Sequence, residues 1–473
     1  MDNEIEMDDG INDIADIPVS PALTDPVILV NLLTHVAAKT ARRVCKVWNQ
    51  TVLSLPEATI HLKLRKEDPN LTPLSSFSSH ISRLNLHLDT SLLPTLSKIL
   101  QNDCPNLTRF HLHVYDRTGN APDADTIFLP AITRNRLTSI FIKATPTSTI
   151  THALHIVTQN LVQSSPNLTH LELSYGLFPF LGSCQKLTSL VIWITGYLPC
   201  ENYQPIISCS HLSEMLVQVA EGLESLHFRG SCRNSRNHRA IRRRNVDLPP
   251  MPRLKHFVNE LVDLFGCGSD LEDISSLRMP LLERLALKKG WNYVPHLDDV
   301  LTNVSTRVHL FAGVTSLKLG EVYDHECLSE LKLPFPRLDR LEIEARTLTR
   351  INGVVSHLEV GEVLKACEFL GLSHLGLRLL KSGDSLGNLV AGMELFKTLK
   401  SFHVEMKASP ICRVDDDTDD FAGKYGIETV EQFLLKDLGG LESVRIGGIH
   451  MKPATRERLT RFIAENKLPI KFY

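Results

Sequence analysis

Two nine-residue stretches decide the fold: residues 104–112 read CPNLTRFHL, and residues 165–173 read SPNLTHLEL. Both contain one six-position phrase, apolar-x-x-apolar-x-apolar, which follows a Pro-Asn pair. The fourth and sixth positions of the phrase are apolar and alternate with polar residues, which is the period of a β-strand. Each copy therefore predicts a short strand that buries one face and leaves the other open.

The phrase recurs along most of the chain. Further clear copies are PLLERLAL at 280–287 and PRLDRLEI at 336–343, whereas LKHFVN at 254–259 has Asn259 at its last apolar position. The mean spacing is about 30 residues, and single steps range from 19 to 42. Such a period is typical of a solenoid, in which units too small to bury their own apolar faces stack side by side. The thirteen copies begin at residues 81, 107, 137, 168, 187, 223, 254, 282, 314, 338, 372, 399 and 441.

Helical stretches separate the copies. Residues 152–165 and 91–103 carry apolar side chains at helical spacing, and Pro105 and Pro166 stand where a helix must end before the strand begins. We therefore expect one strand and one helix in each full unit. The competing interpretation is an ordinary α/β enzyme with several Leu-rich strands, but such strands would not repeat the same six-position phrase.

This pattern resembles the leucine-rich repeat over roughly residues 75–450. The resemblance implies an α/β solenoid, a horseshoe with parallel strands on its concave face. The third, fifth and seventh positions of each phrase should then point out of that face. Exposed aromatic side chains on a rigid surface are candidate binding hot spots, unless irregular loops cover them. We expect a protein substrate to bind at Arg109, His111, Phe141, Val191 and Trp193.

Residues 25–52 predict two short helices upstream of the repeats. Asp25 and Pro26 form a helix start signal, and the stretch ARRVCKVWNQTV at 41–52 sets Val44, Cys45 and Trp48 on one apolar stripe. Two such helices cannot bury this surface alone. They either cap the first repeats or dock on a helix of a partner.

The stretch ARRVCKVWNQTV also resembles the closing helix of an F-box, in which a Val-Cys-Lys-x-Trp run is characteristic, and DPVILVNLLTHV at 25–36 resembles its first helix. An F-box followed by repeats is the order of the F-box/leucine-rich-repeat family. The segment departs from the family at Ile17-Pro18, where Leu-Pro is usual, and in the short connection AAKTA, so the F-box is degenerate.

The family resemblance implies a substrate-recognition subunit of an SCF-type ubiquitin ligase, which is not itself an enzyme. A Skp-type adaptor, and through it a cullin, would bind the helical segment. The competing function is a repeat scaffold for protein interactions that has no role in ubiquitin transfer. The expected adaptor-binding residues are Leu29, Leu32, Leu33, Val44, Cys45, Val47 and Trp48.

Three regions follow from these observations. We expect an acidic disordered tail at residues 1–16, an F-box-like helical segment at 17–60 and a leucine-rich-repeat domain at 61–473, with loop insertions at about 231–250 and 408–424. The stretch CRNSRNHRAIRRRN at 232–245 is an exposed insertion, a nuclear-import patch or a dock for acidic or phosphorylated partners. The acidic run 415–420 lacks the Gly and Glu of a calcium loop, so we expect a solvated insertion.

Composition argues against several other classes of protein. The net charge of −3 over 473 residues does not favour nucleic acid as a partner, and the ten cysteines include no C-x-x-C pair that would suggest zinc. Neither a signal peptide nor a run of apolar residues long enough for a membrane span is present, so we expect a cytoplasmic or nuclear protein. Motifs of metalloproteases, serine hydrolases and P-loop enzymes are missing, and we expect no cofactor or metal.

Overall fold

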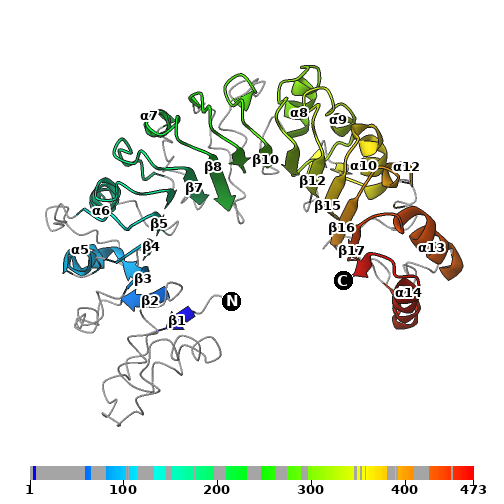
Figure 1. The fold of residues 1–473 in the computed structure, drawn as a ribbon, viewed down its shortest axis with the longest axis horizontal. Coiled ribbons are helices and arrows are strands. Elements are labelled where there is room, and N and C mark those ends of the chain that lie inside the picture. Colours follow the sequence, from blue (N-terminus) through cyan, green and yellow to red (C-terminus); the bar gives the residue numbers. More distant parts are fainter. Residues whose placement is uncertain are drawn as a thin grey trace, which may run out of the picture. The chain divides into compact units, whose positions relative to one another are not determined.

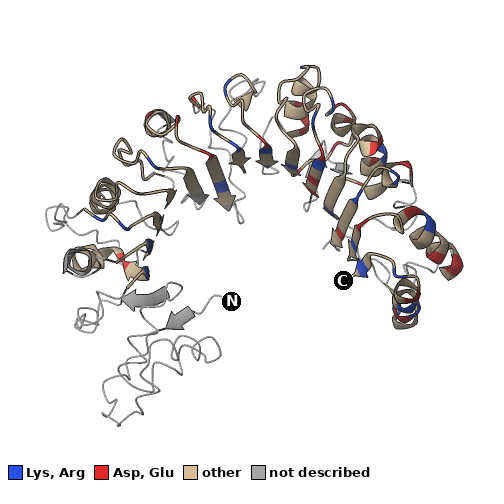
Figure 2. Ribbon diagram, viewed as in Figure 1, with Lys and Arg blue, Asp and Glu red and all other residues tan. Residues whose placement is uncertain are grey.

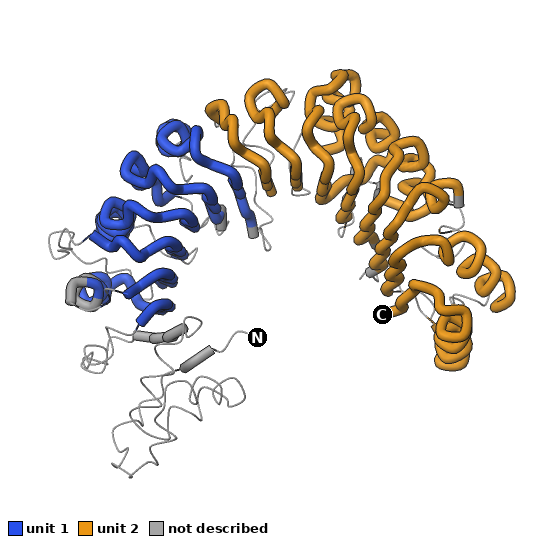
Figure 3. The backbone as a smooth tube through the Cα atoms, in the orientation of Figure 1, with its two compact units in different colours: residues 1–235 blue, residues 236–473 orange. Residues whose placement is uncertain are grey.

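The computed structural model divides into two compact units, residues 1–235 and residues 236–473 (Figure 3). The structure describes residues 4–6, 59–64, 81–102, 104, 106–115, 133–144, 152–174, 176–195, 209–231, 247–260, 274–288, 297–345, 349–351, 354–356, 358–380, 389, 393–407, 426–448 and 451–473.

A parallel sheet is the framework of the first unit (Figure 1). Each strand pairs in parallel with the next strand along the chain. The strands are β1 (Glu4–Glu6), β2 (Thr59–Leu64), β3 (Arg83–Asp89), β4 (Arg109–Tyr115), β5 (Ser139–Ala144), β6 (His170–Ser174), β7 (Ser189–Thr195) and β8 (Ser225–Ser231).

The two N-terminal strands correct the sequence prediction. Residues 4–6 were expected in a disordered tail, but they form β1, in which Ile5 pairs with Ile60 of β2. An open sheet edge offers unpaired backbone groups that any short extended segment can join. Strand β2 also begins at Thr59, which lies inside the segment expected to be helical.

Helices of the first unit lie on one side of its sheet (Figure 1). Helix α6 follows the predicted stretch 152–165 closely, and its apolar residues at helical spacing are buried: Ala153, Leu154, Val157, Leu161 and Val162. The helices are α5 (Leu93–Asn102), preceded by the 3₁₀ turn η4 (Thr90–Leu92), α6 (His152–Gln163) and α7 (Cys209–Val217).

The second unit repeats the same construction. Its main strands also pair in parallel, each with the next, and a separate antiparallel hairpin joins β13 (Thr349–Ile351) to β14 (Val354–Ser356). The main strands are β9 (His256–Asn259), β10 (Arg284–Lys288), β11 (Ser316–Gly320), β12 (Arg340–Ala345), β15 (His374–Leu380), β16 (Ser401–Lys407), β17 (Ser443–Gly447) and β18 (Ile470–Phe472).

Helices again occupy one side of this sheet (Figure 1). Their apolar residues pack on the strands, and the short turns η8 and η9 continue two of them. The elements are α8 (Leu297–Ser305), α9 (Glu326–Ser329), α10 (Val360–Cys367), η8 (Glu368–Leu370), α12 (Met393–Phe396), α13 (Ile427–Phe433), η9 (Leu434–Leu438) and α14 (Pro453–Glu465).

The apolar positions of the phrase form the core of both units. The first residue of every copy, from Ile81 to Leu441, is buried. The fourth and sixth positions are buried too, as Leu171 and Leu173 illustrate. Asn259 occupies the same kind of site in register with Leu287 and is fully buried, so the copy with the polar residue still keeps the strand geometry.

A ladder of threonines sets the register between strands of the first unit. The backbone N–H groups of Thr138 and Ser139 both donate to the carbonyl oxygen of Thr108, at 2.9 and 3.2 Å. The side-chain hydroxyl of Thr169 donates to the Thr138 carbonyl at 3.1 Å, and that of Thr188 donates to the Thr169 carbonyl at 3.2 Å. Residues at the start of each of these strands thus donate hydrogen bonds to a carbonyl oxygen at the start of the preceding strand. This fixed alignment places the outward-facing residues in rows across the sheet.

Outward-facing glycines in the second unit leave room for side chains from the neighbouring strand. The stem of Lys288 on β10 lies over Gly320 on β11, where an added Cβ would be 2.6 Å from Lys288 Cγ. The lysine thus crosses β11, and its Nζ lies 3.9 Å from the Glu344 carboxylate on β12. Tyr473 likewise lies over Gly447 on β17 and bonds to His403 on β16.

The α/β class and the parallel strand order agree with the sequence prediction. Among the described residues, no helix is both long and apolar enough to cross a membrane. The expected adaptor-binding residues, the arginine-rich stretch at 232–245 and the insertion at 408–424 lie outside the described residues.

Candidate partner-binding surface

The side of the first sheet that faces away from its helices is called here the open face. Most alternate residues of β3 to β6 are half-exposed or exposed there, while those between them are buried; Ser174, at an outward position of β6, is itself buried. The register places the outward positions of β3 to β8 in three rows: Arg83, Arg109, Ser139, His170, Ser189 and Ser225; Asn85, His111, Phe141, Glu172, Val191 and His227; His87, His113, Lys143, Ser174, Trp193 and Arg229.

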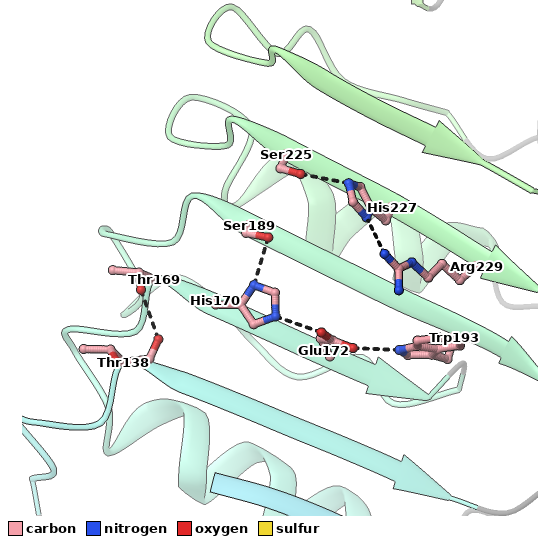
Figure 4. Close-up of polar contacts among 9 residues, drawn as sticks. All are labelled: Thr138, Thr169, His170, Glu172, Ser189, Trp193, Ser225, His227 and Arg229. Carbon is pink, nitrogen blue, oxygen red and sulfur yellow. Dashed lines mark hydrogen bonds and ion pairs between the residues drawn. The ribbon is translucent and has the colours of Figure 1, made fainter. Parts of the chain in front are cut away.

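Glu172 on β6 joins side chains from two strands (Figure 4). Its Oε2 accepts a hydrogen bond from Trp193 Nε1 at 2.8 Å, and its Oε1 lies 2.9 Å from His170 Nε2. The other ring nitrogen of His170, Nδ1, lies 2.9 Å from Ser189 Oγ on β7. Both carboxylate oxygens are therefore occupied, and the Trp193 ring is fixed in one orientation.

The pKa of Glu172 is lowered from its ordinary value of 4.5. Partial burial acts to raise this pKa, but the hydrogen bonds from His170 and Trp193 and the positive charge of Arg229 outweigh it. The carboxylate is thus ionised at neutral pH. A general acid or base works best with a pKa near the working pH, so this group is suited to holding Trp193 rather than to moving protons.

Two cations flank the ring of Trp193. Lys143 Nζ on β5 lies 5.4 Å from the ring centroid, and Arg229 Cζ on β8 lies 5.3 Å from it. Arg229 Nη2 is 3.5 Å from His227 Nδ1, and His227 Nε2 is 3.0 Å from Ser225 Oγ (Figure 4). Cations at this distance from an aromatic ring are attracted to it, so both cations help to hold the indole.

A second group of rings lies beside this one on β3 to β5. The imidazoles of His87 and His113 stack in parallel, with centroids 4.3 Å apart and planes 4° apart. The ring of Phe141 lies 5.0 Å from that of His113 and 5.3 Å from that of His111. Lys143, two residues after Phe141 on β5, connects the two groups because it contacts Trp193.

The predicted substrate-binding residues fall into different situations. Arg109, His111, Phe141 and Trp193 lie on the open face, as expected. Val191 has the same orientation by alternation, but its side chain is only 3% exposed, which contradicts its prediction as a contact residue. It lies in register between Glu172 and His227, whose longer side chains leave it little access to solvent.

Sequence reasoning missed four residues of this surface: Lys143, His170, Glu172 and Arg229. The alternation rule applied to the second stretch, SPNLTHLEL, could have found His170 and Glu172, since they occupy its outward positions. Nothing in the sequence aligned Glu172 with Trp193, which is 21 residues away. Among the described residues, no group of three or more His, Cys, Asp or Glu side chains could hold a metal ion.

Comparison with known proteins gives no identification, because no family model matches the chain and no curated protein is similar to it.

Replacing Glu172 by glutamine is expected to lower the free energy of unfolding by about 1–2 kcal/mol at pH 7. The reason is that a neutral amide replaces the charged carboxylate in the two hydrogen bonds with His170 and Trp193. A carboxyl whose pKa is lowered by folding stabilises the folded state above its unfolded pKa, and this contribution is lost as the pH falls through the folded pKa. Urea unfolding should therefore show a gap between wild type and variant at pH 7 that narrows below pH 4.5. Glu214→Gln, at an exposed position on α7, is the matched control. A gap that widens on acidification would contradict this assignment.

Proposed function

We propose that this chain is a leucine-rich-repeat solenoid protein that binds a protein partner on the open face of its first unit. The observation that carries the proposal is the fixed, half-exposed indole of Trp193, held by Glu172 and flanked by Lys143 and Arg229. Tryptophan and arginine are enriched among the residues that dominate binding energy at protein interfaces. A ring that is already ordered loses little conformational entropy on binding.

The partner, in this proposal, is a substrate of an SCF-type ubiquitin ligase. Support comes from the F-box-like segment predicted at residues 17–60, whose apolar stripe would dock on a helix of the adaptor in this proposal. A Skp-type adaptor bound there would link the chain to a cullin. The chain would then act by proximity, because holding a substrate lysine near a charged conjugating enzyme raises its effective concentration.

Co-expression with a Skp-type adaptor tests the ligase part of the proposal, and the chain supplies a matched pair of variants. Trp48→Ala is expected to remove the adaptor from the purified full chain, because Trp48 lies on the predicted docking stripe. Trp193→Ala is expected to retain the adaptor at the wild-type ratio. Band ratios after size-exclusion chromatography give the measurement.

A repeat scaffold without a ubiquitin role is the second candidate, favoured by Ile17-Pro18 and by the short AAKTA connection, which depart from the F-box pattern. If the wild-type chain elutes without the adaptor, the ligase part of the proposal is wrong and the scaffold remains. If Trp48→Ala retains the adaptor, the docking residues are wrong.

A further inference from the structure

The second unit has an open face of its own, and this face contains a hollow of about 210 Å³ over β15. The name Gly376 hollow is used here for this space, which lies between residues of β12, β15 and β16. Its polar lining includes Arg340, Glu342, His374, Arg378 and His403. Pockets for drug-sized ligands measure roughly 300–1,000 Å³, so this hollow has the size for a single side chain.

The missing side chain of Gly376 creates the hollow. Gly376 stands in register between Glu342 on β12 and His403 on β16, where a row of side chains would otherwise continue. An added Cβ would lie 3.3 Å from Glu342 Cγ, which is tight contact but no overlap. Glycine in a strand weakens it, and it often marks a place where another group approaches the backbone closely.

The strands of the second unit carry both Lys or Arg and Asp or Glu residues (Figure 2), and the whole chain has a net charge of −3. Outward-facing cations outnumber anions on the strands of the second unit. The cations are Arg284, Lys288, Lys318, Arg340, Arg378, Arg445 and Lys471, and the anions are Glu342, Glu344 and Glu405.

The three anions are already paired, whereas one lining cation is not. Glu342 lies 3.5 Å from Lys318 Nζ, and Glu405 lies 3.4 Å from Arg378 Nε. Glu344 lies 3.9 Å from Lys288 Nζ. The guanidinium of Arg340, which lines the hollow and is exposed, has no hydrogen bond or ion pair within the part of the chain that the structure describes.

The two histidines that line the hollow have hydrogen bonds of their own. His374 Nδ1 lies 2.8 Å from Ser401 Oγ, which sets the orientation of that imidazole. His403 Nε2 bonds to the hydroxyl of Tyr473. The unpaired guanidinium thus stands beside a preformed space whose other polar walls have their own partners.

We propose that the Gly376 hollow binds one carboxylate side chain of an extended acidic segment of a protein partner, with Arg340 as its charged donor. The inference rests on the proposed function only in taking the open faces as binding surfaces, and it adds the chemical class of the partner. A single carboxylate fits the charge of one free guanidinium. A nucleic acid strand carries a phosphate at every nucleotide and would need a run of free cations, whereas the hollow offers one unpaired guanidinium, which favours a peptide.

Binding of fluorescein-labelled octaglutamate to the purified full chain tests the inference by fluorescence anisotropy. Gly376→Val fills the hollow without changing any charge, and Arg340→Gln removes the donor. Each is expected to weaken binding at least tenfold, the loss expected for a hydrogen bond to a charged group. Arg445→Gln removes the same charge from the same face outside the hollow, and its effect is expected to stay below about threefold because of screening.

The unfolding temperature of Gly376→Val distinguishes blocking from misfolding. Valine favours strands and Gly376 has no left-handed backbone angle, so the variant is expected to melt at or above the wild-type temperature. If Gly376→Val melts below the wild-type temperature, the binding measured for Arg340→Gln alone decides whether the inference stands.

Several results would overturn the inference: octaglutamine binding as tightly as octaglutamate, equal losses in Arg340→Gln and Arg445→Gln, or tighter binding of oligo-dT. The assay contains neither the Skp-type adaptor nor the protein partner proposed for the open face of the first unit. A chain that captures the adaptor but ignores octaglutamate would therefore reject this inference and leave the proposed function standing.

Discussion

Replacing Trp193 by alanine is expected to weaken capture of the protein partner by about 30-fold or more, which corresponds to the roughly 2 kcal/mol or more of a binding hot spot. The indole bonds to Glu172 at 2.8 Å and has two cations close to its ring, so it is presented to a partner without further ordering. Its loss also releases Lys143 and Arg229 from fixed positions, which raises the entropy cost of using them.

Quantitative affinity purification from one cell lysate, with tagged wild type and variants compared side by side, provides the measurement. Trp193→Phe keeps an aromatic ring beside the cations but loses the Nε1–H donor, so an intermediate loss is expected. Trp48→Ala serves as the matched control, because it removes a tryptophan far from this surface in the sequence. If Trp193→Ala recovers the same partners in the same amounts, the open face of the first unit is not the binding surface.

Replacing Gly448 by alanine is expected to destabilise the second unit by roughly 2–5 kcal/mol. Gly448 follows β17 with a φ of +74°, a left-handed conformation that costs an alanine about 1–2 kcal/mol. An added Cβ would also overlap the backbone carbonyl of Met406 on β16. A side chain could relieve such an overlap by changing its rotamer, but the backbone cannot. The two strands would have to separate locally, with loss of packing at their ends.

Gly440→Ala is the matched control for this substitution. No atom lies within 4 Å of a Cβ added at Gly440, and this residue has no left-handed φ. The control is expected to change the free energy of unfolding by no more than about 1 kcal/mol. Urea unfolding followed by circular dichroism compares the two variants. Equal midpoints for Gly448→Ala and wild type would show that the chain takes another path after β17.

The sequence predicted those features that depend on local periodicity. Alternation within the phrase identified the buried residues of each strand, and helical spacing identified α6. Strand β1 was missed because three residues carry too little periodicity, and its pairing depends on a sheet edge that is distant in sequence. The F-box-like segment stays a prediction, since residues 17–58 lie outside the described part of the chain.

The binding surface was predictable only in outline. Outward positions such as Phe141 and Trp193 follow from alternation, but exposure depends on the neighbours in the same row, as Val191 illustrates. The bond between Glu172 and Trp193 and the space over Gly376 arise from the alignment of different strands. Steps of 19 to 42 residues between phrases leave that alignment undetermined until the strands are paired.

Side chains that cross an entire strand have a consequence for the cooperativity of unfolding in the second unit. In most stacked-repeat proteins, each repeat contacts only its immediate neighbours, and total stability is close to a sum of single-repeat and adjacent-pair contributions. Lys288 passes over Gly320 to Glu344, and Tyr473 passes over Gly447 to His403, so both interactions connect second neighbours. Fraying from either end should therefore proceed in blocks of three strands at these two places, and a pairwise Ising description would underestimate the sharpness of the transition.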